Sequence, residues 1–277
     1  MIFLMKRHSK LKRRLRKITF ITIITFLFFT LVASSDINYY ESLENTAVIN
    51  NVNTIPSTPF IPNQQLDEQQ RFLATITHQI ANLPQPNTFE YIILRAYGTV
   101  FINQEPEIKL PPKVILDNEQ QTQEYQGNMR VDLVEGTTEC YLQKAASEAF
   151  NKARYLQNIP LKSGYSGDCT RSFATNLRFW QKYTNSQTLS QVQQGKETKI
   201  LGTVAPPGTS QHLWGLAIDL RVSNQAQRKA LNQNGWFQTV ENDLPHWTYL
   251  GWNEEDLPKF GLRNKTVNGI TYWVTPL

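Results

Sequence analysis

The segment GTSQHLWGLAIDL, residues 208–220, carries a histidine and a carboxylate in apolar, glycine-bearing surroundings. A second segment, DLPHW at residues 243–247, repeats that combination. The chain has only 4 histidines, and these segments hold two of them, His212 and His246. An imidazole next to a carboxylate in such a setting is typical of a buried metal site. We therefore interpret the rest of the chain as the framework around these two segments.

Two imidazoles and one carboxylate are available as ligands, from His212, His246 and Asp219. A catalytic zinc site has three protein ligands and keeps a fourth position for water. His212 and Asp219 are an odd number of residues apart, so on one strand they would point to opposite faces. They share a metal only if the chain turns between them, and Trp214-Gly215 is suited to such a turn. The competing interpretation is a pair of core histidines satisfied by hydrogen bonds.

A further carboxylate, Asp243, precedes His246 closely, and Pro245 fixes the backbone between them. This spacing places an acid beside the metal without making it a ligand. Such an acid takes a proton from the attacking water and returns it to the leaving amine, which is typically worth about 10²–10⁴-fold in rate. Glu241 is the rival base, but it is expected to be solvated. The residues therefore predict zinc-dependent peptide hydrolysis.

The pattern SxHxxGxAxD over residues 210–219, followed by DxPHW over 243–247, resembles the VanY-type D-alanyl-D-alanine carboxypeptidases. These belong to a group of zinc peptidases that includes lysostaphin-like enzymes and the hedgehog signalling domain. The resemblance covers about residues 140–252, and LKSGY at 161–165 resembles the strand and turn before the family's substrate arginine. It implies peptidoglycan stem peptides as substrate. It also implies that His212, Asp219 and His246 are zinc ligands and that Asp243 is the base.

The chain departs from the family pattern at two places. In the family an arginine usually follows the Ser-Gly-Tyr turn directly, whereas here residues 166–170 intervene before Arg171. We assign Arg171 to the substrate carboxylate, because a guanidinium fork suits that partner; an ordinary arginine at a helix start is the alternative. Asp243 stands where the carboxypeptidases have Glu, which resembles the endopeptidase branch. Ser210 is expected to bind the substrate or, alternatively, to shape the turn.

Strand and helix patterns mix without a regular βαβ rhythm, which predicts an α+β fold. We expect a small, partly antiparallel sheet flanked by helices, with the zinc site in a cleft on the sheet. Helices are predicted at 66–83, 138–157, 171–183, 187–194 and 225–234. One or two strands are predicted at 89–102, and further strands at 114–116, 129–133, 159–165, 216–220 and 246–250, with a closing Asn-Gly hairpin at 266–274. The glutamine-rich piece before residue 129 is a loop or a short helix.

Charge is distributed unevenly along the chain. Every residue charged at neutral pH before Asp36 is a lysine or arginine, and these 8 exceed the net charge of +5, so the remainder carries −3. That remainder has no basic run, which argues against a nucleic-acid partner. The basic block is followed by an uncharged run at 18–33, which is typical of an export signal.

We therefore predict a signal or signal-anchor segment at 1–33, an extended polar linker at 34–65 and a zinc peptidase domain at 66–277 with its core at about 138–252. The length of the basic region favours an uncleaved anchor, and a cleavage near Ala33 is the alternative. This places the domain in the cell envelope, on the periplasmic or extracytoplasmic face of the plasma membrane, anchored or secreted. Export also favours a disulfide between Cys140 and Cys169, the only cysteines, over two buried thiols.

The leading functional hypothesis is a zinc D,D-carboxypeptidase that removes the terminal D-alanine from peptidoglycan stem peptides. The alternative within the group is an endopeptidase that cuts inside the stem or the cross-bridge. A hypothesis of another class is a non-catalytic, zinc-containing cell-wall-binding module. The carboxylate of Asp243 argues against this last hypothesis, because a structural zinc site needs no additional acid.

Overall fold

The computed structural model describes residues 58–277. The predicted signal or anchor segment and most of the predicted linker lie outside the described residues, so those assignments and the domain start at residue 66 stay predictions. From residue 58 onward, none of the helices combines the length and apolar character that crossing a membrane requires.

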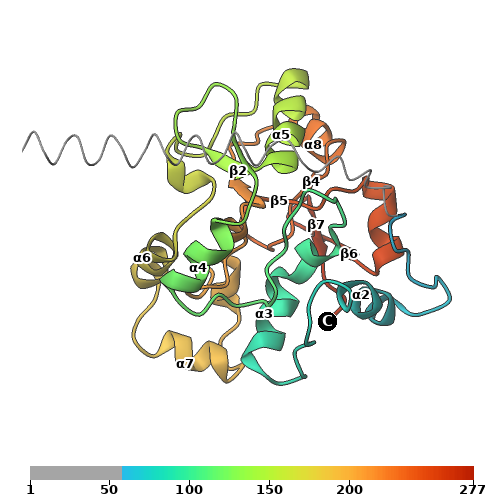
Figure 1. The fold of residues 1–277 in the computed structure, drawn as a ribbon, viewed down its shortest axis with the longest axis vertical. Coiled ribbons are helices and arrows are strands. Elements are labelled where there is room, and N and C mark those ends of the chain that lie inside the picture. The colour runs from blue at the N-terminus through green and yellow to red at the C-terminus, as the bar shows by residue number, and fades with distance from the viewer. Residues whose placement is uncertain (1–57) are drawn as a thin grey trace, which may run out of the picture. The chain divides into compact units, whose positions relative to one another are not determined.

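Short helices surround three small antiparallel sheets (Figure 1), which confirms the predicted α+β class. The helices are α2 (Glu68–Ile76), α3 (Phe89–Tyr97), α4 (Glu119–Gln126), α5 (Lys144–Leu156), α6 (Phe173–Tyr183), α7 (Thr188–Gln193) and α8 (Gln225–Asn232). The 3₁₀ turns are η1 (Gly98–Ile102), η2 (Ser166–Asp168), η3 (Lys199–Gly202), η4 (Gln211–Trp214) and η5 (Glu254–Phe260). The strands are β1 (Val131–Leu133), β2 (Tyr141–Gln143), β3 (Ala217–Asp219), β4 (Trp236–Phe237), β5 (His246–Tyr249), β6 (Arg263–Val267) and β7 (Ile270–Val274).

The central sheet has the strand order β3-β5-β4, with β5 antiparallel to both neighbours. Its register sets Asp219 directly opposite His246 and Ala217 opposite Thr248. Residues opposite one another on adjacent strands share a face of the sheet, so the pairing alone brings a carboxylate and an imidazole together. The predicted strand at 159–165 is reduced to one bridge, between Leu161 and Leu220, at the end of β3.

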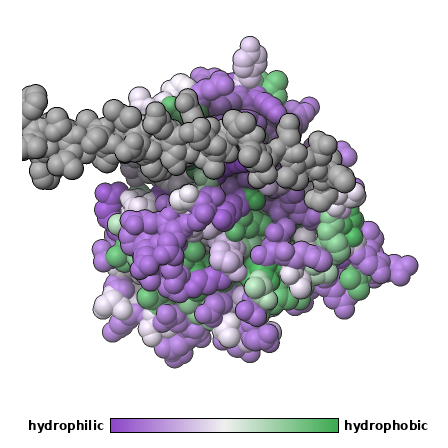
Figure 2. Space-filling view, viewed as in Figure 1, coloured by the Kyte–Doolittle hydropathy of each residue, from purple (hydrophilic) through white to green (hydrophobic). Residues whose placement is uncertain are grey.

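Large aromatic side chains fill the interior around this sheet. Trp214, Trp236 and Trp247 are all at most 1% exposed. Phe150 of α5 packs edge-on against Trp236 with ring centroids 6.0 Å apart, and Phe101 of η1 lies 5.5 Å from Trp214. Each buried indole removes about 150–250 Å² of surface from water. The strands that carry the site residues therefore pack against a large apolar core. The face seen in Figure 2 is accordingly mostly hydrophilic, with small hydrophobic areas between polar ones.

The predicted strand at 89–102 is wrong, because this segment forms α3 and η1. The β-branched and aromatic content suggested a strand, but Ile92, Ile93 and Tyr97 follow helical spacing and are buried. The Thr88 side chain accepts a hydrogen bond from the backbone N–H of Tyr91 and so caps the helix. One buried face together with a cap outweighs strand propensity over so short a segment.

The predicted strand at 114–116 is also wrong, since this segment runs as a loop whose Leu116 N–H donates to the carbonyl of Gly208 at 2.8 Å. The helix predicted from 138 begins only at Lys144, because residues 141–143 pair with β1 as strand β2. The predicted helix at 66–83 ends at Ile76. The strand within 129–133 and the three remaining helices lie where they were predicted.

The predicted disulfide and the predicted Asn-Gly hairpin turn are both confirmed. Cys140 and Cys169 form a disulfide that ties the start of β2 to the loop before α6. The closing hairpin of β6 and β7 turns at Asn268 and Gly269, with φ of 52° and 78°. Positive φ at both central residues is the requirement of a type I′ turn, which Asn-Gly meets best.

Candidate active site

The turn expected between the first two site residues is present, as η4 and the residue after it. Ser210 accepts a hydrogen bond from the backbone N–H of His212 and caps η4, and Gly215 ends it with φ of 63°. Any other residue at position 215 would have an unfavourable backbone conformation, and its Cβ would lie 3.2 Å from the Gln143 side chain. The chain therefore reverses between His212 and Asp219, and β3 then returns the carboxylate to the imidazole.

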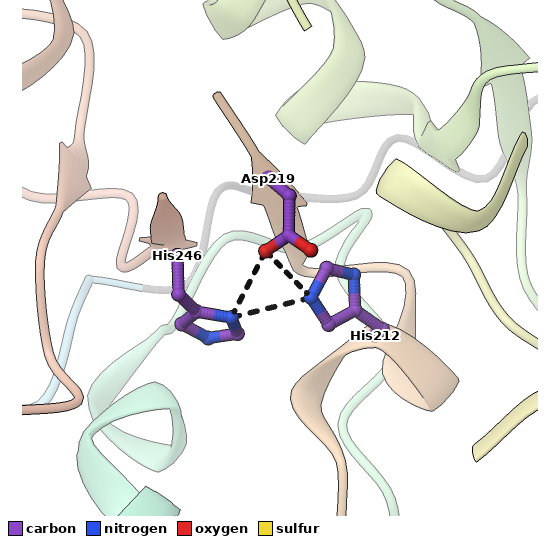
Figure 3. A group of neighbouring side chains, drawn as sticks. All are labelled: His212, Asp219 and His246. Carbon is purple, nitrogen blue, oxygen red and sulfur yellow. Dashed lines mark hydrogen bonds and ion pairs between the residues drawn. The ribbon is translucent and has the colours of Figure 1, made fainter. Parts of the chain in front are cut away.

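The structure brings His212, Asp219 and His246 together (Figure 3). The His212 Nε2 lies 3.2 Å from the His246 Nδ1 and 3.3 Å from the Asp219 Oδ1, and the last two atoms are 3.7 Å apart. Zinc binds nitrogen and carboxylate oxygen at about 2.0–2.1 Å, which makes the edges of its coordination tetrahedron about 3.3 Å. The three atoms are therefore spaced as three ligands of one tetrahedral ion.

Hydrogen bonds fix which nitrogen of each ring faces the others. The His212 Nδ1 donates to the carbonyl of Cys169 at 2.9 Å, and the His246 Nε2 lies 2.8 Å from the Gln211 Oε1, to which it donates. The lone pairs of His212 Nε2 and His246 Nδ1 consequently point at one another and at the Asp219 carboxylate. Three electron-rich atoms in this arrangement repel unless a cation lies between them. This argues against two core histidines and for a metal site with ordered outer partners.

Gln211 was missed by the sequence analysis, although it is the immediate neighbour of His212. Its Oε1 also accepts from the Thr248 hydroxyl at 2.7 Å, and its Nε2 donates to the carbonyl of Tyr97 at 2.7 Å. Thr248 in turn lies 2.7 Å from the Thr239 hydroxyl. The sequence signal for this hydrogen-bond network was the two-residue period of the strand. Thr248 follows His246 by two positions and therefore shares its face.

The electrostatics keep His212 and Asp219 in the forms that bind metal. Burial lowers the pKa of His212 to about 4, with the charge of Arg171 acting in the same direction, so the ring is neutral at physiological pH. Burial alone would raise the pKa of Asp219. The contacts with His212 and His246 and the Arg171 guanidinium together outweigh it and hold the pKa of Asp219 well below its usual range.

Arg171 lies in the site but is engaged with the protein. Its Nη2 donates to the Asp219 Oδ2 at 2.5 Å, its Nε donates to the carbonyl of Gly167 at 2.5 Å, and its guanidinium lies 4.8 Å from the Phe179 ring centre. It thus holds the carboxylate oxygen that faces away from the histidines. Its assignment to a substrate carboxylate stays a prediction.

A cavity of about 300 Å³ opens onto the candidate ligands. Its wall includes all six predicted site residues: Arg171, Ser210, His212, Asp219, Asp243 and His246. Within residues 58–277, no group donates a hydrogen bond to the Asp243 carboxylate. Burial raises the pKa of Asp243, the nearby His246 opposes this, and the charge of Asp219 adds to it. The cavity therefore contains one acid whose oxygens are available to a water or a substrate.

Ser210 lines the cavity, whereas Glu241 does not. Ser210 is buried in the cavity wall as the cap of η4, and its role toward substrate stays a prediction. Glu241 binds Lys265 at 2.7 Å and does not line this cavity, as expected for a solvated acid. Trp214 and Trp247 belong to the core and do not line the cavity either.

A family model matches the part of the chain that holds the candidate site. The family model VanY, D-alanyl-D-alanine carboxypeptidase, matches residues 129–263, which contain every candidate site residue. A search of curated proteins gives no significant match.

Three solved structures show a low overall similarity. A mutant of the vancomycin-resistance D,D-pentapeptidase VanY in complex with Zn(II) is 18% identical over 49% of this chain and 85% of its own, with a TM-score of 0.32. The vancomycin-resistance D,D-dipeptidase VanXYg with a D-Ala-D-Ala phosphinate analogue is 14% identical over 49% and 73%, with a TM-score of 0.29. The LD-carboxypeptidase LdcB is 18% identical over 48% and 70%, with a TM-score of 0.31.

Proposed function

We propose that the protein hydrolyses the terminal D-alanine from peptidoglycan stem peptides, because the family model VanY, D-alanyl-D-alanine carboxypeptidase, matches residues 129–263. One observation carries the proposal. Three ligand atoms face one point of a cavity, and the same wall holds an acid whose carboxylate accepts no hydrogen bond from residues 58–277. A structural zinc site is closed by a fourth protein ligand, whereas a catalytic one keeps that position for water.

His212, Asp219 and His246 would hold a zinc ion. When bound, zinc supplies Lewis-acid chemistry, which polarises a carbonyl and acidifies water. The protein contributes the orientation of both rings, through the Cys169 carbonyl and the Gln211 side chain. Arg171 donates to the Asp219 Oδ2, which leaves the Oδ1 facing the histidines.

Asp243 serves as the general base. Its carboxylate accepts the proton of the attacking water and then delivers it to the nitrogen of the leaving D-alanine. A raised pKa suits this double role, because a stronger base takes the first proton more readily and the acid form still gives it up. Burial in the cavity wall causes the shift, so the same environment that surrounds the substrate also adjusts the base.

The N-terminal sequence and the disulfide support a site of action outside the cytoplasm. A basic block followed by an apolar run precedes the domain, and Cys140–Cys169 is a bond that persists in oxidising compartments. We propose that residues 1–33 export the domain and hold it at the extracytoplasmic face of the membrane. Fractionation of cells, with and without residues 1–33, tests this; recovery of the full chain in the cytoplasmic fraction would contradict it.

The activity is tested with the full chain and a synthetic stem peptide that ends in D-Ala-D-Ala. Release of free D-alanine, measured by mass spectrometry and abolished by a chelator, is the expected result. Internal fragments without free D-alanine would identify an endopeptidase instead. Stoichiometric zinc with no cleavage of any stem peptide would identify a non-catalytic module and refute the proposal.

A further inference from the structure

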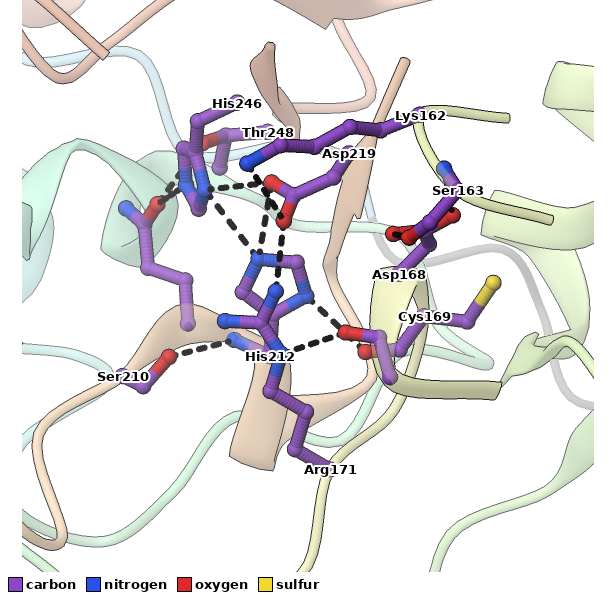
Figure 4. Close-up of polar contacts among 12 residues, drawn as sticks. Lys162, Ser163, Asp168, Cys169, Arg171, Ser210, His212, Asp219, His246 and Thr248 are labelled. Atoms are coloured by element: carbon purple, nitrogen blue, oxygen red, sulfur yellow. Dashed lines mark hydrogen bonds and ion pairs between the residues drawn. The ribbon is translucent and has the colours of Figure 1, made fainter. Parts of the chain in front are cut away.

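Lys162 lies in the wall of the cavity, on a segment that runs beside β3. Its backbone N–H donates to the Asp219 carbonyl at 2.9 Å, and the preceding Leu161 pairs with Leu220. This pairing fixes the position of Lys162 relative to Asp219. Figure 4 shows its side chain extending alongside the Asp219 carboxylate, with the ammonium near the three candidate ligands.

The ammonium of Lys162 makes a long ion pair with Asp219 but no hydrogen bond to the residues that the structure describes. Its Nζ lies 4.0 Å from the Asp219 Oδ2, which is beyond hydrogen-bond distance, and half of the side chain is exposed. Across residues 58–277 it donates no hydrogen bond. Arg171, by contrast, already donates to Asp219 and to Gly167. If Arg171 turned toward a substrate, the buried Asp219 oxygen would lose its closest partner, which is costly.

We propose that Lys162 binds the free carboxylate at the C-terminus of the substrate. This rests on the proposed function and specifies it, because it selects peptides cut at their last residue over peptides cut internally. One residue of extended chain spans about 3.3–3.6 Å. The carboxylate of the leaving residue therefore lies one such step beyond the scissile carbonyl, within reach of an ammonium 4.0 Å from a ligand carboxylate.

The flexible stem of Lys162 suits this role. An ammonium on four rotatable bonds follows a small, mobile carboxylate, whereas the Arg171 fork is held rigidly by two hydrogen bonds. An internal peptide has a neutral amide at the same place. Such a substrate would cover the ammonium without pairing it, which disfavours internal cleavage.

The test compares one stem peptide ending in D-Ala-D-Ala as the free acid with the same peptide ending in a C-terminal amide. The variants are Lys162→Met and Lys162→Arg in the full chain. Lys144→Met is the matched control, because Lys144 is 44% exposed and lies 3.9 Å from Glu148, but does not line the cavity. Bound zinc and circular dichroism are measured for each variant.

We expect Lys162→Met to lower kcat/KM for the free acid by about 10- to 100-fold, mostly through KM, as for loss of a charge-assisted hydrogen bond. The amide should be turned over equally by Lys162→Met and the wild type. Lys162→Arg should recover part of the loss, and Lys144→Met should behave as the wild type. The free-acid peptide should also bind zinc-free Lys162→Met more weakly than zinc-free wild type, while the amide binds both equally.

Three outcomes would overturn the inference. Equal loss on both peptides would mean that Lys162 acts at the scissile bond, and loss of zinc would mean that it acts only through Asp219. No loss on either peptide would assign the carboxylate to another cation, with Arg171 or Lys182 of the same wall as candidates. Failure of the wild type to release D-alanine would instead refute the proposed function itself.

Discussion

Replacing Gln211 by methionine tests whether the outer partners of the metal site set its affinity. The change keeps the length of the side chain but leaves the His246 Nε2–H without its acceptor and removes the donor to the Tyr97 carbonyl. The Thr248 hydroxyl can still pair with Thr239. One buried donor without a partner costs about 1–3 kcal/mol of folding free energy. Loss of a partner that orients a ligand costs about 10- to 100-fold in metal affinity.

Gln143→Met is the matched control for this experiment. Gln143 is fully buried and, like Gln211, makes three hydrogen bonds, here to Lys109 N, Lys109 O and Trp214 O, but it touches none of the metal ligands. Both variants should lose a similar free energy of unfolding as metal-free proteins, measured by urea denaturation. Only Gln211→Met should bind zinc more weakly in competition with a chromophoric chelator.

Equal weakening of zinc binding in the two variants would show that general destabilisation, and not the orientation of His246, controls the site. Unchanged zinc affinity in Gln211→Met would show that the sheet alone positions His246. Either result would refute the role given to the Gln211 side chain.

Further predictions concern the base, pH and the disulfide. Asp243→Asn should retain stoichiometric zinc and lose about 10²–10⁴-fold in kcat/KM, whereas His212→Ala should lose zinc, both measured by metal analysis and D-alanine release. Asp243 acts deprotonated and its pKa is raised from 3.8. The kcat/KM of the wild type should therefore fall as the pH drops through a midpoint above 3.8. This acidic fall should be absent in Asp243→Asn, and if it persists, Asp243 is not its source. Reducing Cys140–Cys169, which closes a loop with a sequence separation of 29, should cost about 3–4 kcal/mol of stability. It should also weaken zinc binding, because the Cys169 carbonyl orients His212; unchanged affinity after reduction would argue against that coupling.

The candidate site was largely predictable because its residues are chemically rare in this chain. Two of four histidines and two aspartates lie in two short segments, and a glycine between His212 and Asp219 marks the turn that the metal geometry requires. The strands that carry Asp219 and His246 were also predicted, from alternating side chains, but their pairing was not. These signals are local, and the sequence displays them directly.

The partners around the site were not predictable in the same way. Gln211 and Lys162 are common residue types, and their roles arise only when segments distant in sequence come together. The strand predicted at 89–102 failed for a related reason. Ile92 and Ile93 favour both strand and buried helix, and the Thr88 cap and the packing of one face decide between them.

The pairing of Asp219 with His246 has a consequence for how the domain holds its shape. Side chains alternate between the faces of a strand, so a slip of β5 by one residue would turn His246 away from Asp219 to the other face and put Trp247 in its place. An ion bound by both residues penalises that slip, since it would lose a ligand. A bound ion therefore fixes the register of two neighbouring strands. The temperature of unfolding should rise with the concentration of free zinc.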